Sequence, residues 1–205
     1  AQDTVQAERI LLQPYWEALA DEPMPFDVAP IVLCSGIESD WANALARRHQ
    51  GTVVRIDTMS PESITEAVAD LSPSTPLVFA AWQEPKAPLL TPARLIEAER
   101  RGLQKLRGLL QGMARRSEPG RLVILTRGAQ AVVPNERMDP TFAALIGFAQ
   151  SAARELTGLE LECTDLPLDP GHATRGWDLD GYRWVRQTGL FASVSYTHLT
   201  LPTKA

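Results

Sequence analysis

The turn at residues 34–41 is the first place in this chain where a nucleotide could bind. A short apolar run at 28–34, typical of a buried strand, precedes it, and a helical pattern follows. A dinucleotide site at such a turn needs glycines, so that backbone N–H groups can approach a pyrophosphate. The turn reads CSGIESDW and contains one glycine, two carboxylates and a bulky tryptophan, namely Gly36, Glu38, Asp40 and Trp41. The sequence therefore predicts a structural turn that binds no phosphate.

The end of the apolar run 122–125 and the helix after it are the second place. Short-chain reductases carry a serine after this strand and a tyrosine and a lysine on the next helix, where the lysine lowers the tyrosine pKa so that it can donate a proton. Here Thr126 and Arg127 end the strand, and the helix carries Phe142 and Ile146. Since Phe142 has no proton to donate and Ile146 has no charge, we expect both to be packing residues.

The remaining reactive side chains are scattered. His49, His172 and His198 lie far apart in the sequence, and we expect each to be an exposed surface residue. The sequence contains no nucleophile elbow, no phosphate loop and no histidine or cysteine cluster with metal-ligand spacing. No catalytic, cofactor-binding or metal-binding residue is therefore predicted.

Two further groups have structural explanations. Glu160, Glu162 and Asp165 fall within the strand-like run 159–166, as expected for a strand near the edge of a sheet. Cys34 and Cys163 both fall in strand-like runs, where cysteine behaves as a small hydrophobic residue. We expect two buried, reduced thiols, because a disulfide framework or a metal site would need more ligands.

The composition is that of one ordinary globular domain. The chain has 205 residues, of which 44% are hydrophobic and 22% charged, and a net charge of -5. This charge argues against a nucleic-acid partner, because phosphate binding needs a basic face. No apolar stretch reaches the roughly 20 residues of a membrane span, and no signal peptide opens the sequence. We therefore expect a cytoplasmic protein with no membrane partner.

Apolar runs alternate with helical patterns along the chain. The expected strands are 28–34, 52–56, 77–82, 122–125 and 159–166, and the expected helices are 40–50, 60–71, 91–116 and 139–156. Strands joined by crossover helices form parallel sheets. The pattern predicts an α/β fold, a truncated Rossmann-like three-layer sandwich with a mostly parallel sheet. Two additional strands near the ends, at 10–16 and 181–191, are expected to pair with each other.

Local signals mark several helix ends. Ser60-Pro61 and Thr91-Pro92 match the preference for a capping hydroxyl followed by proline at the first helical position. Gly51 is expected to end the first helix in the usual way of a glycine C-cap. The charges of the long helix, at 97–101 and at Arg115 and Arg116, are expected to form a solvated face.

Residues 122–129 (LVILTRGA) and 142–149 (FAALIGFA) resemble the ketoreductase region of modular type I polyketide synthases. The resemblance covers about residues 10–193. The other similar segments are 12–17 (LQPYWE), 155–166 (ELTGLELECTDL) and 181–185 (GYRWV).

The resemblance implies a division of labour in the parent enzyme. Such ketoreductases consist of a structural Rossmann-like subdomain without cofactor and a catalytic subdomain that binds NADPH. This chain resembles only the structural subdomain, and the catalytic half would begin just after Phe191. The parent would reduce a carrier-bound 3-oxoacyl thioester, whereas this fragment would be no enzyme. Its expected partners are the catalytic subdomain of the same chain and neighbouring synthase domains.

The last residues have a different expected origin. Residues 194–203 (VSYTHLTLPT) look like a sequencing adapter translated in one open frame. We therefore expect a domain at 10–193 and a non-native tail at 194–205, which belongs outside the fold as a cloning scar would.

Two other functions stay open at this level. The chain could be a self-contained Rossmann-type oxidoreductase with an atypical site, or a partner-binding module of a synthase that acts without a reductase. An NADPH titration separates the first from a structural role. The sequence downstream of Ala192 separates the second.

Overall fold

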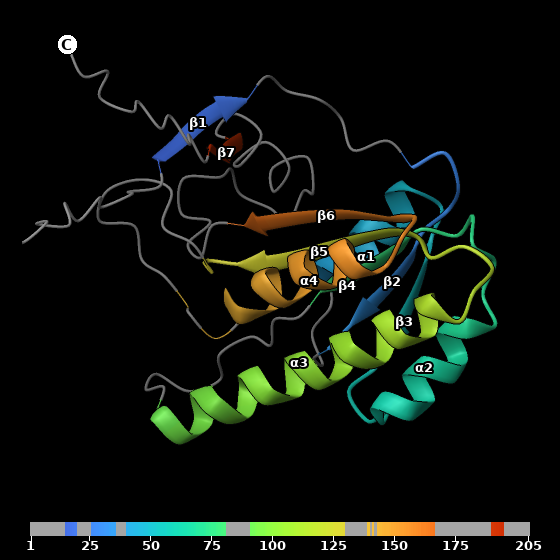
Figure 1. Cartoon of the computed structure of the whole chain (residues 1–205), viewed down its shortest axis with the longest axis horizontal. Coiled ribbons are helices and arrows are strands. Elements are labelled where there is room, and N and C mark those ends of the chain that lie inside the picture. Colours follow the sequence, from blue (N-terminus) through green and yellow to red (C-terminus); the bar gives the residue numbers. More distant parts are fainter. Residues whose placement is uncertain are drawn as a thin grey trace, which may run out of the picture.

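The structure is a computed structural model, and its described residues form a parallel sheet, four helices and a small separate sheet (Figure 1). It describes residues 15–19, 26–35, 40–80, 91–129, 139, 141, 143–166 and 190–194.

The central sheet has five parallel strands in the order β3-β2-β4-β5-β6. The strands are β2 (Ile31–Cys34), β3 (Thr52–Arg55), β4 (Leu77–Ala80), β5 (Gly120–Arg127) and β6 (Leu159–Leu166). The chain first moves outward from β2 to β3 and then crosses back over β2 to β4. The switch point of this doubly wound sheet therefore lies between β2 and β4.

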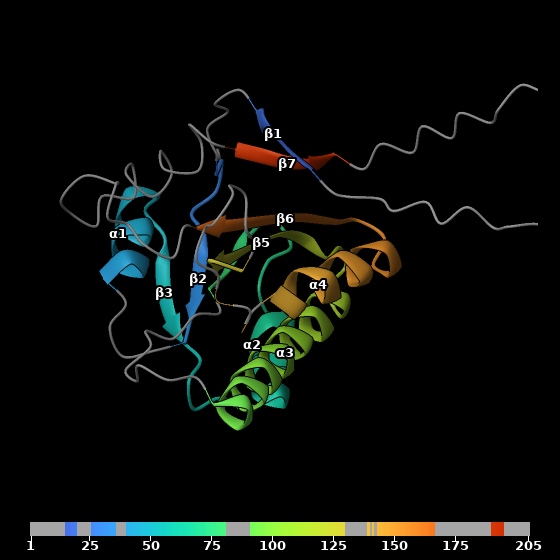
Figure 2. The same cartoon turned by 90° about the vertical axis from the view of Figure 1, so that its left-hand side faces the viewer.

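The helices cover both faces of this sheet. They are α1 (Asp40–Arg48), α2 (Pro61–Ala69), α3 (Pro92–Ala114) and α4 (Ala143–Glu155). Helix α1 lies on one side, whereas α2, α3 and α4 lie on the other (Figure 2). Because crossover connections are right-handed, reversing the direction of winding at β2 moves the helices to the opposite face. The predicted three-layer α/β fold is thus confirmed.

The core lies between the middle strands and α3. All four residues of β4 are buried, and Phe79 is 0% exposed. Helix α3 contributes Leu106, Leu109 and Met113, each 0% exposed, at the spacing of one helix face. Strands buried on both faces read as continuous apolar runs, which explains why these segments were recognisable in the sequence.

Helices α2 and α3 pack closely, and both begin as predicted. The Ser60 hydroxyl accepts a hydrogen bond from Ser63 N (3.2 Å), and the Thr91 hydroxyl accepts one from Arg94 N (3.4 Å). At the crossing of the helices, a Cβ on Gly108 would lie 2.4 Å from the Pro61 carbonyl oxygen. Glycine is therefore required at this position for the close approach of the two backbones.

Gly51 has a different role from the one predicted. The left-handed residue after α1 is Gln50, with a φ of 54°, and Gly51 is not among the residues with positive φ. A Cβ on Gly51 would lie 2.3 Å from the Pro30 carbonyl oxygen. Glycine is needed here because the start of β3 passes close to the segment before β2.

Arg116 corrects the prediction of a solvated charge. It is 8% exposed, and its Nε donates to the Val68 carbonyl oxygen at 3.0 Å. Burial lowers the pKa of its guanidinium. In contrast, Arg100 and Arg101 are exposed and form ion pairs with Glu97, as a solvated face would. Arg116 lies just after the end of α3, and from there its side chain reaches the backbone of α2. The bond therefore joins the two helices.

The two terminal strands pair with each other, as predicted, but in different residues, and the pairing is antiparallel. Strand β1 (Tyr15–Leu19) pairs with β7 (Leu190–Val194), with Tyr15 opposite Val194. In both views the pair lies beyond β6, the strand at that edge of the parallel sheet (Figures 1 and 2). Residues 10–14 and 181–189 of the predicted strands, and 195–205 of the predicted tail, lie outside the described residues.

Candidate functional site

The switch point at the carboxyl ends of β2 and β4 is where a sheet of this order binds ligands. Ser35 directly follows β2, and its side chain is buried (9% exposed). Residues 36–39 of the predicted structural turn lie outside the described part of the chain, as do the side chains of Asp40 and Trp41. The prediction that this turn binds no phosphate therefore stays a prediction.

Three polar side chains from three elements meet at this point. The Lys105 ammonium group, carried by α3, donates to the Ser35 hydroxyl at 2.9 Å, and that hydroxyl donates to Asp57 Oδ1 at 3.1 Å. Lys105 is 8% exposed, whereas Asp57 lies at the exposed turn after β3. We call this arrangement the Lys105–Ser35–Asp57 relay. It connects a buried cation to an exposed carboxylate through one hydroxyl group.

The electrostatics of the relay are dominated by burial. Removal from water lowers the pKa of the Lys105 ammonium, and the negative charge of Asp57 raises it by less. Arg101, one turn earlier on α3, lowers it further. The charge of Lys105 is therefore a net cost to the folded state that its partners only partly offset.

Sequence reasoning missed all three residues, although two signals were present. Lys105 stands within the apolar stripe of α3, directly before Leu106, where a charge is out of place. Asp57 follows the second strand of the unit, about 20 residues beyond the turn, where dinucleotide-binding folds place the carboxylate that binds a ribose hydroxyl. In this chain Asp57 accepts from Ser35 instead.

The carboxyl ends of β5 and β6 are the second place where chemistry was considered. Thr126 is 0% exposed, and its hydroxyl donates to Asp165 Oδ1 at 2.9 Å. The backbone N–H of Ala129 donates to the same oxygen at 2.9 Å. Asp165 therefore holds the loop after β5 against β6.

Asp165 differs from the two other carboxylates of its strand. It is 7% exposed and lies on the opposite face of β6 from Glu160 and Glu162. Glu162 forms a half-exposed ion pair with Arg121 (2.9 Å). All three carboxylates thus belong to the edge strand β6, as expected, but Asp165 is buried whereas Glu160 and Glu162 are not.

Helix α4 starts close to this second place. The hydroxyl and the N–H of Thr141 both donate to the Asp139 carboxylate, the N–H at 3.0 Å, and Asp139 N donates to the Gly128 carbonyl oxygen. Ile146 is 7% exposed, which confirms its predicted packing role. Phe142 lies outside the described residues.

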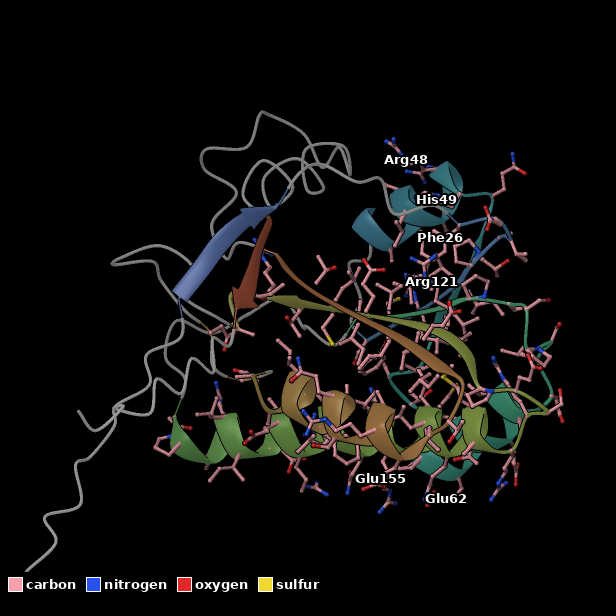
Figure 3. All side chains as sticks on the ribbon, turned by 45° about the horizontal axis from the view of Figure 1, so that its top comes forward. Phe26, Arg48, His49, Glu62, Arg121 and Glu155 are labelled. Carbon is pink, nitrogen blue, oxygen red and sulfur yellow. The ribbon has the colours of Figure 1, made fainter. Side chains whose placement is uncertain are left out.

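The predicted surface histidine His49 is half-buried. Its ring lies edge-on to the Phe26 ring at 5.0 Å between centroids, and the Arg121 guanidinium lies 5.2 Å from the centroid of the same ring (Figure 3). These contacts attach the segment before β2 to the end of α1 and to the start of β5. They lie at the amino ends of the strands, whereas the switch point lies at the carboxyl ends. His172 and His198 lie outside the described residues.

The cysteines and the metal prediction can be compared with the described residues. Cys34 is a free thiol and buried, as predicted, and Cys163 is a free thiol but half-buried. Burial and the neighbouring Glu162 charge raise the pKa of Cys163 to about 11, so its reactive thiolate is scarce at neutral pH. Among the described residues, no group of three or more histidine, cysteine or acidic side chains could hold a metal ion.

The five-stranded parallel sheet with helices on both faces defines a doubly wound, Rossmann-like α/β fold. A family model described as "Polyketide synthase extender module SpnB, Rossmann fold domain" matches residues 39–170. The chain therefore belongs to this family of Rossmann-fold domains from polyketide synthase extender modules. No curated protein matches the chain.

One solved structure gives a further comparison of folds. The chain is similar to part of an "Adenylation, ketoreductase, and pseudo Asub multidomain structure of a keto acid-selecting NRPS module", with a TM-score of 0.65 and 14% sequence identity. The match covers 84% of this chain and only 16% of that chain. At this identity the likeness concerns the fold alone. No helix among the described residues is long and apolar enough to span a membrane.

Proposed function

We propose that this chain is the structural, non-catalytic half of a polyketide synthase ketoreductase. It would hold and orient a catalytic half of the same parent chain. That half would use NADPH to reduce carrier-bound 3-oxoacyl thioesters to 3-hydroxyacyl thioesters. One observation carries the proposal. Among the described residues, polar side chains are bonded to each other at both places where this fold performs chemistry: Lys105, Ser35 and Asp57 at the first, and Thr126 and Asp165 at the second.

The second place is unsuited to proton transfer. Carbonyl reduction needs a proton donor whose pKa is lowered by a nearby cation. The hydroxyl that ends β5, on Thr126, is committed to Asp165, and α4 offers the buried apolar Ile146 where the cation is required. The side chains described at this edge therefore stabilise the loop after β5 and leave no donor poised for a substrate.

Two exposed apolar side chains support a packing role. Ile96 on α3 is 63% exposed and Phe148 on α4 is 38% exposed, and both helices cover the same face of the sheet. The first turns of α3 also extend past the carboxyl ends of β5 and β6 (Figure 1). We place the contact with the catalytic half at these two side chains.

A fluorescence titration with NADPH tests the absence of a cofactor site. We expect no binding to the purified chain and no NADPH-dependent ketone reduction. Binding at micromolar NADPH would refute the proposal.

Reconstitution tests the supporting role directly. The catalytic half, expressed from the intact gene, should oxidise NADPH faster in the presence of this chain. Ile96→Asp should weaken the gain, whereas Arg107→Ala, at another exposed position of α3, should leave it unchanged. Equal activity of the catalytic half with and without the chain would contradict a supporting role.

One observation favours the alternative of a self-contained oxidoreductase. Asp57 stands after β3, where such enzymes bind a ribose hydroxyl. The alternative requires that Ser35 release this carboxylate and that Lys105 withdraw. The NADPH titration discriminates the two functions.

A further inference from the structure

We propose that the Lys105 side chain occupies, from within the protein, the ligand position at the β2–β4 switch point. It fills a site for a primary alkylammonium group that Ser35 and, through it, Asp57 create. This site lies within the chain itself and does not depend on a ketoreductase partner.

The geometry of the relay places the ammonium at the carboxyl edge of the sheet, where doubly wound folds bind ligands. Ser35 is the first residue after β2, and Asp57 lies just after β3, so both mark the carboxyl edge of the sheet. Lys105 reaches this edge from the middle of α3 and bonds to Ser35 Oγ at 2.9 Å. A side chain from the helical layer therefore ends where a bound ligand would lie.

Space filling alone does not explain a lysine here. The neighbouring residues of the same stripe, Leu106 and Leu109, are apolar and 0% exposed. A leucine or methionine would fill the position without the cost of burying a charge. What a lysine adds is a donor for Ser35 and a positive charge facing Asp57.

A chemical-rescue experiment on the full chain tests the proposal. Lys105→Ala removes three methylene groups and the ammonium, which together correspond to n-propylammonium. We expect the substitution to lower Tm by about 5 °C, as loss of a buried side chain does in a chain of this size. Roughly 0.1 M n-propylammonium chloride should then restore about half of that loss by binding to the folded state.

Matched controls separate a specific site from a solvent effect. Potassium chloride at equal ionic strength and n-propanol should restore much less, and Arg107→Ala should show no rescue by n-propylammonium. Equal rescue by n-propanol would mean that only volume matters and would overturn the proposal. A folded Lys105→Ala protein that n-propylammonium does not stabilise beyond potassium chloride would also overturn it.

A measurement on the unaltered protein covers the case in which the variant fails to fold. Acetic anhydride labelling, followed by mass spectrometry, gives the acetylation rate of Lys105 in the native and the urea-unfolded chain. We expect native Lys105 to react at least tenfold more slowly, because its ammonium is buried and bonded. Equal rates would show that the Lys105 ammonium is not held at the switch point and would overturn the proposal.

Discussion

Two places along the carboxyl edge of the sheet, the β2–β4 switch point and the β5–β6 end, provide hydrogen-bond partners for their polar side chains in different ways. At the β2–β4 switch point, the Lys105–Ser35–Asp57 relay buries a cation whose charge is only partly offset. At the β5–β6 end, a buried carboxylate, Asp165, accepts from a hydroxyl and a backbone N–H. The first arrangement joins a helix to the sheet, whereas the second joins a loop to a strand.

The two arrangements contribute differently to the stability of the fold. Among the described residues, Asp165 is the acceptor for both the Thr126 hydroxyl and the Ala129 N–H, in a site that is 0–7% exposed, so both donors depend on this carboxylate. Lys105 could be replaced by an apolar residue without leaving an orphan at exposed Asp57. We therefore expect the β5–β6 end to matter more for stability and the switch point to matter more for what can bind at the carboxyl ends of β2 and β4.

The largest expected effect is at the β5–β6 end. Asp165→Ala leaves the Thr126 hydroxyl and the Ala129 N–H buried without an acceptor, which should cost about 3 kcal/mol of unfolding free energy. Urea denaturation measures this loss. Asp165→Asn keeps an acceptor oxygen and should lose less than half as much. Equal losses in the two variants would mean that the charge, and not the acceptor, holds this loop.

The second largest effect is expected where α3, the helix that carries Lys105, packs against α2. Gly108→Ala places a Cβ 2.4 Å from the Pro61 carbonyl oxygen and must push α3 away from α2. We expect a loss of about 2 kcal/mol in the same assay. Gly147→Ala on α4, where nothing lies within 4 Å of the new Cβ, should be neutral or slightly stabilising. A neutral Gly108→Ala would show that the helix contact is looser than described.

The switch point itself should respond more weakly. Ser35→Ala removes the hydroxyl that bonds Lys105 to Asp57, and we expect a loss of about 1 to 2 kcal/mol. Ser72→Ala, which removes an exposed hydroxyl bonded to exposed Ser74, should change stability by less than about 0.5 kcal/mol. A loss at Ser35 larger than that at Asp165 would reverse the comparison between the two ends.

The smallest expected effect is a pH dependence next to the β5–β6 end. The pKa of Cys163 is raised from 9.0 to about 11 in the folded chain, so the folded state keeps a proton that the unfolded state releases. The stabilisation is complete below pH 9 and is lost as the pH rises through 11. The difference in Tm between the unaltered chain and Cys163→Ala should therefore change across this window, with the unaltered chain losing more. An unchanged difference would mean that Cys163 is solvated like a free thiol.

Local patterns in the sequence were sufficient to predict the strands and helices of the parallel sheet and their order along the chain. Apolar runs such as 122–125 and the Ser60-Pro61 start of α2 are signals within a few neighbouring residues, and the structure confirms both. Strand–helix–strand alternation then required a parallel sheet, because only a crossover connects parallel neighbours. Pairing of the terminal strands was also predictable, although their residues shifted to 15–19 and 190–194.

The candidate site was predictable only as an absence of the usual residues. The apolar Ile146 could be read from the sequence, and its burial agrees. The contact that the structure shows at this site, Lys105 bonded to Ser35, joins residues 70 positions apart in the sequence. No local sequence pattern predicts a contact over that separation. Asp57 offered a signal only if its place after β3 was compared with dinucleotide-binding folds.

By itself, the sequence determined which segments become strands and helices, because hydrophobic periodicity and capping act within a few residues. The tertiary structure alone decided that Lys105, Arg116 and Asp165 are buried while Arg100 and Asp57 meet solvent. Burial of a charged side chain depends on what packs against it from distant parts of the chain. That packing also decides whether a polar group is available for a ligand or is used within the protein.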